Sequence, residues 1–259
     1  MKIFKLILIA LILYSCNKGS DNNGSNCARV LAKTTCPAST NGSKNLYFFN
    51  ADKTLAKTIY YSDSVTISRA DTFYYDNGKL AKSCYSLNEI DFEAPYAYSE
   101  YDYSNGRLSA SRYFVKQSNL YSLYSNSTYV TDDSGRIAVV NQYRNGNLQK
   151  NRFEYDNNSN LMKVYIQFGA GGTESLYDEY FDYDSMPNPF YQMSFEFDYD
   201  MYLYAIDRFA KHNYRRHIRG SNNETFQLSY YSEGKLKSIK DISNPFPAAT
   251  ERLFTWECR

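Results

Sequence analysis

The sequence predicts an all-β protein, folded as an antiparallel meander of short hairpins that forms a curved sheet or an open, barrel-like array. Three observations support this fold class. Tyrosine and phenylalanine supply 28 and 16 residues against a single tryptophan, and both residue types favour the half-buried, pleated surface of a sheet. A short turn sequence recurs along the chain, and its copies are spaced as the tips of hairpins would be.

The N-terminus has the pattern of a secretory signal rather than of a membrane helix. Lys2 and Lys5 precede an apolar run from Leu6 to Leu13. This run is far shorter than the roughly 20 residues that span a bilayer. A basic start, a short apolar core and a small residue before the cleavage site indicate export.

The end of this signal resembles the lipobox of bacterial lipoproteins, in Leu13-Tyr14-Ser15-Cys16, with Tyr14 where a small residue is usual. Cleavage of that motif leaves the cysteine as a lipidated N-terminus, and each buried methylene of an acyl chain contributes about 0.8 kcal/mol. The resemblance implies a signal peptide over residues 1–15 and a lipidated Cys16 with a flexible tether over residues 16–26. It places the protein in the cell envelope, anchored to the outer membrane on its periplasmic or surface side. The alternative is a plain cleavable signal that leaves Cys16 unmodified.

Residues 27–259 are expected to form one all-β domain, since such folds often run to about 250 residues undivided. The net charge is +1, so the overall balance gives no indication of a nucleic-acid partner.

The cysteine count agrees with export, because an even number remains after Cys16 and disulfides persist outside the cytoplasm. Three pairings are open. We favour Cys27 with Cys36, which are close in the chain, and Cys84 with Cys258, which would tie the C-terminus to an early hairpin. A zinc site is the competing interpretation, but no CxxC pair or nearby histidine supplies ligand spacing. No metal or other cofactor is expected.

The recurring turn sequence runs from Tyr or another β-former, through small polar residues and usually glycine, to a polar residue and then Leu or Ile. Asn-Gly between alternating apolar positions is the strongest local hairpin signal, because the tight turn needs positive φ, which glycine adopts at little steric cost. Residues 155–161 form a copy without glycine, and residues 49–55 form a degenerate first copy. The tips are predicted at Gly78, Gly106, Gly135, Gly146 and Gly234.

The spacing of the turn leucines supports this prediction. From Leu55 to Ile137 the turn Leu or Ile recurs after 25, 28 and 29 residues, enough for two strands and two turns per unit. It then recurs after 11 and 13 residues, up to Leu161, which is the spacing of successive strands in a meander. We therefore expect roughly 12 to 16 strands, at one short strand per 8 to 12 residues.

One segment has two interpretations. Residues 195–201 alternate between apolar and acidic side chains, as a strand with one buried face does. Tyr202, Ile206 and Phe209 fall at helical spacing, so a short helix over residues 200–211 competes with a strand there.

The repeat resembles the Tyr-Asp-x-x-Gly-x-Leu pattern of the YD repeats of Rhs-type proteins. Residues 155–161 match it with Ser159 for glycine, and residues 131–137 match it with Thr131 for tyrosine and Ile137 for leucine. More similar is a group of uncharacterised Bacteroides-type lipoproteins, which combine a lipobox cysteine, degenerate YD-like hairpins and a Tyr-Asp-Ser-x-x-Asn-Pro-Phe segment. Residues 183–190 resemble that segment, and Lys211-His212-Asn213 resembles the stretch that comes after it in the group. The resemblance implies an array of YD-like hairpins. It implies no reaction, since the group has no established activity.

Both histidines lie in a basic run over residues 211–219. The side chains of His212, Arg215, Arg216 and His217 could hold a phosphate, sulfate or carboxylate, since Arg offers bidentate geometry. The same run also suits a solvated turn and strand edge, where basic side chains discourage pairing with another edge. No nucleophile turn of the GxSxG type accompanies the histidines.

Acidic residues gather over residues 174–184 and 196–200. Clustered carboxylates could bind calcium or act as the paired carboxylates of a glycoside hydrolase. Alternating charges of this kind are also the usual means of wetting the outer face of a sheet.

Two classes of function remain open. The first is a binding or interaction module for a glycan, a peptide or a partner protein. It is favoured because repeats build extended surfaces and because tyrosines offer flat apolar area with a hydroxyl, although tyrosines also pack simply across strands. The second is a carboxylate-based carbohydrate hydrolase. Catalysis needs a few converging groups, which the sequence does not show, so no enzyme is expected.

Overall fold

The structure is a computed structural model that describes residues 30–35, 43–52, 54–63, 65–87, 94–189, 191, 209–243 and 251–258. The described residues form strands joined by turns and loops, without a helix. In order the strands are β1 (Val30–Thr35), β2 (Lys44–Phe49), β3 (Leu55–Tyr61), β4 (Ile67–Asp76), β5 (Lys79–Leu87), β6 (Ala97–Ser104), β7 (Arg107–Gln117), β8 (Leu120–Thr131), β9 (Ile137–Arg144), β10 (Asn147–Tyr155), β11 (Leu161–Phe168), β12 (Ser175–Phe181), β13 (Arg216–Arg219), β14 (Asn222–Tyr230), β15 (Leu236–Asp241) and β16 (Glu251–Cys258).

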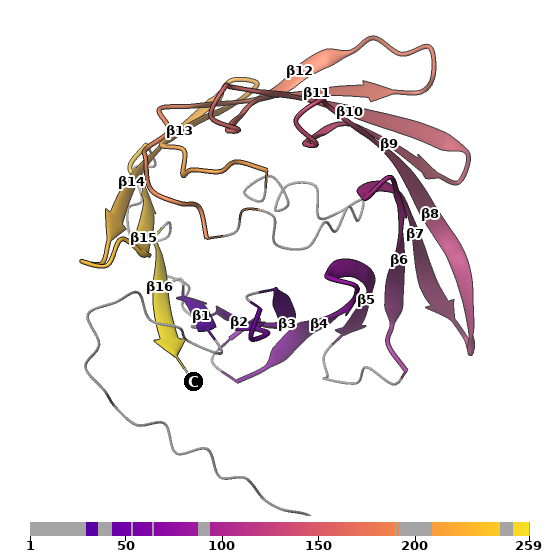
Figure 1. The fold of residues 1–259 in the computed structure, drawn as a ribbon, viewed down its shortest axis with the longest axis horizontal. Helices are drawn as coiled ribbons and strands as arrows, with labels where there is room; N and C mark the ends of the chain where they lie inside the picture. The colour runs from indigo at the N-terminus through magenta and orange to yellow at the C-terminus, as the bar shows by residue number, and fades with distance from the viewer. Residues whose placement is uncertain are drawn as a thin grey trace, which may run out of the picture.

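Each strand pairs antiparallel with its neighbours in the chain, and β1 also pairs with β16, so the strand order returns to its start (Figure 1). The predicted all-β antiparallel meander is confirmed. Its curvature brings the first strand beside the last. Residues 200–208, which cover most of the alternative helix, lie outside the described residues. In the part of the chain that the structure describes, no helix has the length and apolarity to cross a membrane.

The connections between strands lie at two ends of the ring. One end, here called the repeat-turn end, holds the turns that join β2 to β3, β4 to β5, β6 to β7, β8 to β9, β10 to β11 and β14 to β15. The start of β1 and the end of β16 lie at this end too, because Val30 pairs with Cys258 and Leu31 with Phe48. Gly146 joins β9 to β10 at the opposite end. The shorter spacing on either side of Leu148 thus marks a change of end.

The core lies on the inner face of the ring. The described ends of the connection between β12 and β13, residues 182–189 and 209–215, run inside the ring (Figure 1). Phe209 stacks on Phe153 with ring centroids 4.9 Å apart. It belongs to the same buried cluster as Phe73, Tyr101 and Val164. Because alternate residues of a strand face opposite ways, this cluster assigns the inner face of the strands from β2 to β12.

Tyrosines on the inner face bond to serines on the preceding strand. The hydroxyl of Tyr101 lies 3.0 Å from Ser83 Oγ, and that of Tyr129 lies 2.8 Å from Ser111 Oγ. All four side chains are buried. A buried hydroxyl needs such a partner, so these tyrosines fill the interior without leaving polar atoms unsatisfied.

The outer face carries ion pairs. Arg112 bonds to Asp102 at 2.5 Å across β6 and β7, and Arg152 bonds to Glu174 at 2.7 Å. Tyr101 and Phe153, which are next to Asp102 and Arg152 in the chain, face the core. The charged side chains therefore point away from the core, as expected for a sheet face in contact with water.

The favoured disulfide between Cys84 and Cys258 finds no support in the strand order. Cys84 lies in β5 and Cys258 ends β16, and β1 to β4 lie between these two strands around the ring. Adjacent strands are about 4.8 Å apart, whereas a disulfide needs Cα atoms within about 7 Å. Cys16, Cys27 and Cys36 lie outside the described residues.

Candidate functional site

Two types of turn form the hairpin tips. In the Asn-Gly tips both central residues have positive φ, with 49° at Asn77 and 75° at Gly78, which defines the tight turn that matches the twist of a hairpin. The longer tips have one such residue. Gly135 has φ 81°, and its N–H donates to the Asp132 carbonyl at 2.9 Å. Among the other copies of the repeat, Gly106 and Gly146 form tips of the first type, and Ser159 and Gly234 form tips of the second.

Five aromatic side chains donate a hydrogen bond to the backbone carbonyl of a turn leucine or isoleucine about 20 residues before them in the chain. The copies of the repeat that begin at Phe49 and Thr131 have no aromatic hydroxyl, and Tyr231 donates instead to the carbonyl of Phe254 at 2.9 Å. This hydroxyl-to-carbonyl ladder holds neighbouring hairpins at a fixed spacing. Its members are Tyr75 to Leu55 at 2.9 Å, Tyr103 to Leu80 at 3.0 Å, Tyr155 to Ile137 at 2.8 Å, Tyr183 to Leu161, and the Trp256 indole N–H to Leu236 at 2.7 Å.

Tyr183 and Trp256 were not predicted as members of the repeat. Tyr183 begins a Tyr-Asp pair 22 residues after Leu161, and the other tyrosines of the ladder follow their carbonyl partners by 18 to 23 residues. This spacing is a signal that could have identified Tyr183. Trp256 follows Leu236 by 20 residues, but no turn motif accompanies it.

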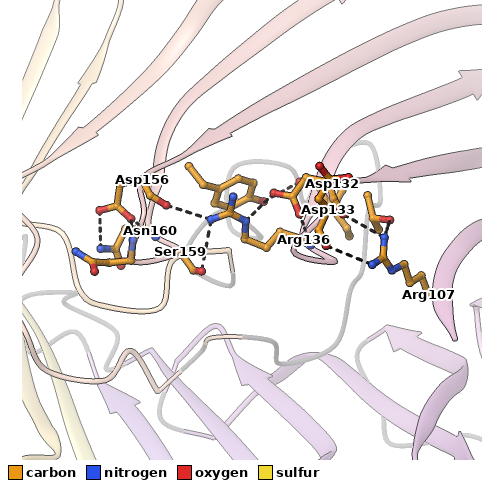
Figure 2. Close-up of polar contacts among 11 residues, drawn as sticks. Arg107, Asp132, Asp133, Arg136, Asp156, Ser159 and Asn160 are labelled. Atoms are coloured by element: carbon orange, nitrogen blue, oxygen red, sulfur yellow. Dashed lines mark hydrogen bonds and ion pairs between the residues drawn. The ribbon is translucent and has the colours of Figure 1, made fainter.

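The basic residue after the turn glycine reaches the next turn along the ring (Figure 2). Arg107 donates to Thr131 Oγ1 at 3.2 Å and to the Asp132 carbonyl at 3.1 Å. Arg136 pairs with Asp132 at 2.7 Å and donates to the Asp156 carbonyl at 3.1 Å. At the repeat without a tyrosine, Arg107 therefore supplies the link between hairpins.

The segments that resemble the Bacteroides-type lipoproteins meet at the repeat-turn end. Residues 184–189 and residues 210–213 together form a neck that leads into the ring. The Asn188 side chain donates to the Ala210 carbonyl at 2.9 Å, and the Asn213 side chain donates to the Met186 carbonyl at 3.1 Å. The Asn188 N–H also donates to the Lys211 carbonyl. These polar side chains thus have a structural explanation, since they hold the two segments together.

A cavity of about 550 Å³ lies between the repeat turns and the neck. Its wall combines aromatic rings, hydroxyls, both signs of charge and apolar side chains. Such a mixture suits a ligand with flat apolar faces and polar groups at its edge. The principal lining residues are Asp52, Thr54, Tyr75, Lys79, Tyr103, Arg107, Thr131, Pro189 and Tyr191.

An apolar groove of about 390 Å³ adjoins the cavity, because Phe49 and Pro189 line both. Its wall is formed mainly by Met186, Leu236 and Trp256, with Glu233 and Lys235 as the charged residues of its lining.

Three of the four basic side chains considered as an anion site have separate partners. His212 Nδ1 lies 2.9 Å from Asn160 Oδ1, and Arg216 lies 3.2 Å from the carboxylate of Asp182. His217 Nε2 lies 2.7 Å from Asp178 Oδ1. The structure therefore does not bring these three side chains to one point.

His217 lies between two carboxylates on the inner face. Its Nε2 is 2.7 Å from Asp178 Oδ1 and its Nδ1 is 3.0 Å from Glu224 Oε2. Burial lowers the pKa of His217, but the bonds to the two carboxylates raise it by more, so the net pKa is raised. For Asp178, burial raises the pKa, and the bonds from His217 and Arg219 lower it by more. The two carboxylates thus favour the protonated form of His217.

Comparisons with known proteins show the fold. No family model matches the chain, and no curated protein matches it. A crystal structure of a porin-like protein from Bacteroides uniformis ATCC 8492 matches with a TM-score of 0.56 at 12% identity, over 90% of this chain and 96% of that chain. One from Bacteroides vulgatus ATCC 8482 matches with a TM-score of 0.50 at 10% identity, over 87% and 97%. At these identities the likeness shows that the chain shares the fold of these two porin-like proteins.

Proposed function

We propose that the protein is an envelope-anchored binding module that holds a carbohydrate in the cavity at the repeat-turn end. The observation that carries the proposal is the composition of the cavity wall. Two tyrosine rings, Tyr75 and Tyr103, stand beside Lys79, Arg107 and an Asp-Thr pair. Sugar rings present apolar C–H faces and a rim of hydroxyls, which match aromatic faces and polar side chains respectively.

The tyrosines are held in place before a ligand arrives. Their hydroxyls donate to the carbonyls of Leu55 and Leu80, so the rings cannot rotate freely. Lys79 lies with its ammonium group 5.3 Å from the centre of the Tyr103 ring. A wall that is already ordered loses less conformational entropy on binding.

The position of the N-terminus supports an envelope role for this cavity. β1 begins at Val30, at the repeat-turn end. A lipid on Cys16 would be joined to this end through residues 17–29, and a flexible chain of that length would have a root-mean-square length of roughly 20 Å. The cavity would then lie on the side of the molecule nearest the membrane.

The proposal is tested with the mature protein on an array of bacterial and host glycans. We expect a bound glycan whose affinity falls at least tenfold in Lys79→Ala and in Tyr191→Ala, because both residues line the cavity. Lys116→Ala is the matched control, since Lys116 lies in β7 next to the opposite end. Equal loss in the control, or peptides bound in preference to glycans, would contradict a carbohydrate site here.

A further inference from the structure

We propose that the ligand of the repeat-turn end is an acylated saccharide, with its sugar in the cavity and its alkyl chain in the adjoining apolar groove. This inference rests on the proposed function and names the class of ligand more closely. Two observations support it. The cavity has a partly polar wall and the neighbouring groove has an apolar one, and the start of β1 lies at the same end of the ring.

The cavity and the groove are neighbours, because Phe49 and Pro189 line both spaces. A ligand that passes over these two side chains would reach from one space into the other. The cavity side carries Lys79, Arg107 and Asp52. A ligand that fits both spaces therefore has a polar end and an apolar end.

The groove wall presents carbon rather than polar atoms. The Trp256 indole N–H donates to the Leu236 carbonyl at 2.7 Å, so its one polar group is occupied and the ring is left as an apolar surface. Met186 packs closely on the turn, since a Cβ added at Gly234 would lie 2.8 Å from its terminal methyl. The site therefore suits a flexible hydrocarbon chain.

The position of the site favours a ligand from the membrane. Both the start of β1 and the end of β16 lie at the repeat-turn end. An anchor on Cys16 would thus keep the groove within a tether's length of a bilayer, where acylated saccharides reside. A groove at the opposite end would lack this proximity.

The only tryptophan of the chain is Trp256, so intrinsic fluorescence reports on the groove directly. The full mature protein is titrated with maltose, N-acetylglucosamine and their dodecyl glycosides, all below the micellar concentration, and isothermal titration calorimetry measures each affinity alongside the fluorescence. We expect a shift of the tryptophan emission with a dodecyl glycoside and an affinity at least tenfold tighter than that of its free sugar. Met186→Glu should abolish this gain, and Lys79→Ala should weaken the sugar and its glycoside by the same factor.

Leu120→Glu, at an exposed position of the opposite end, is the control for unspecific binding of alkyl chains and should change nothing. Equal affinity of sugar and glycoside would overturn the acyl inference and leave the saccharide site standing. Binding of a sugar-free dodecyl sulfobetaine as tightly as the glycosides, unaffected by Lys79→Ala, would overturn both proposals, and so would the absence of measurable binding of every probe. Far-ultraviolet circular dichroism checks that each variant is folded.

Discussion

At the scale of single residues, the hairpin tips depend on backbone conformations that few side chains adopt. Gly106 has φ 81° and follows Asn105 at 52°. Asn tolerates this left-handed region because its side chain bonds locally, whereas a β-branched residue there is a genuine outlier. The backbone conformation of the tip, rather than contacts with neighbours, therefore determines which substitutions destabilise the protein most.

Gly106→Val should lower the free energy of unfolding by about 1 to 3 kcal/mol, the usual cost of such strain. Gly106→Asn should change it much less, and the same order is expected at Gly78 and Gly146. Thermal melts followed by circular dichroism measure both variants. Gly171→Val is the control, because Gly171 is not at positive φ and has open space around it. Equal effects of Val and Asn at all three tips would contradict the turn assignment.

His217 is expected to make the stability of the folded protein depend on pH. Both ring nitrogens face carboxylates, Asp178 and Glu224, so both must carry a proton to donate. Since the folded pKa is raised above the ordinary 6.5, this stabilisation is fully present below pH 6.5 and is lost as the pH rises through the folded pKa.

At pH 6 we expect the free energy of unfolding of His217→Gln to be about 1.5 to 3 kcal/mol lower than that of the wild type, which is the value of a hydrogen bond to a charged group. The difference should shrink as the pH is raised towards 9. Urea titrations across this range provide the measurement. His212→Gln is the control, because His212 Nδ1 faces the side-chain amide oxygen of Asn160. A constant difference between wild type and His217→Gln would mean that His217 is neutral.

At the scale of the elements, each hairpin of the repeat bends at the same place. The register between the two strands of a hairpin shifts by one residue immediately before the residue opposite the turn leucine. Examples are the shifts between Tyr74 and Tyr75, between Asp102 and Tyr103, and between Glu154 and Tyr155. A bulge increases the local twist and bends its strand. The β9–β10 hairpin, whose turn lies at the opposite end, has no such shift. Repetition of this bend in the hairpins with turns at the repeat-turn end is a physical cause of the strong curvature of the sheet.

The hydroxyl-to-carbonyl ladder predicts a specific cost for removing one oxygen atom. Tyr103→Phe and Tyr155→Phe should each lower the free energy of unfolding by about 0.5 to 1.5 kcal/mol, the net value of one hydrogen bond. Tyr143→Phe should change it little, since Tyr143 is an exposed side chain near the opposite end. Urea unfolding of the three variants measures this. A loss in Tyr143→Phe equal to the others would show that the ladder has no special role.

The sequence was sufficient for the local features and insufficient for the long-range ones. Turn chemistry placed the tips, because an Asn-Gly turn is encoded by adjacent residues. The partner of His217 is 39 residues away in Asp178, and their contact depends on which strands pair and in which register. The resemblance to lipoproteins indicated residues 183–190 and 211–213 as a unit, but not that their side chains join to form a neck. The cavity arises only when hairpins far apart in the chain are side by side.

At the scale of the whole molecule, attachment to the membrane depends on residues outside the described part of the chain. We expect Cys16→Ser to release the protein from the membrane fraction, since acyl chains supply the affinity for the bilayer. Fractionation with labelled palmitate tests this. Label that persists in Cys16→Ser would show that lipid is attached elsewhere.

The strand order also makes a prediction about the cysteines. Mass spectrometry of the non-reduced protein should find no peptide that joins Cys84 to Cys258, because four strands separate β5 from β16. Cys84 is buried, so alkylation with iodoacetamide should require unfolding. A Cys84–Cys258 peptide would contradict this arrangement of strands.

The ladder of aromatic donors also bears on how the molecule opens. Each of its bonds couples one hairpin only to the hairpin before it, as the interfaces of a repeat protein couple neighbours along one dimension. In such a chain of couplings, local unfolding starts at the weakest junction and spreads outward. At Thr131 the partly buried aromatic donor is replaced by a long, exposed arginine, Arg107, whose bonds reach the tip of the turn. The β6–β7 and β8–β9 hairpins meet where β7 pairs with β8. Amide hydrogens of this pair of strands should therefore exchange with solvent before those of the hairpins that the ladder joins.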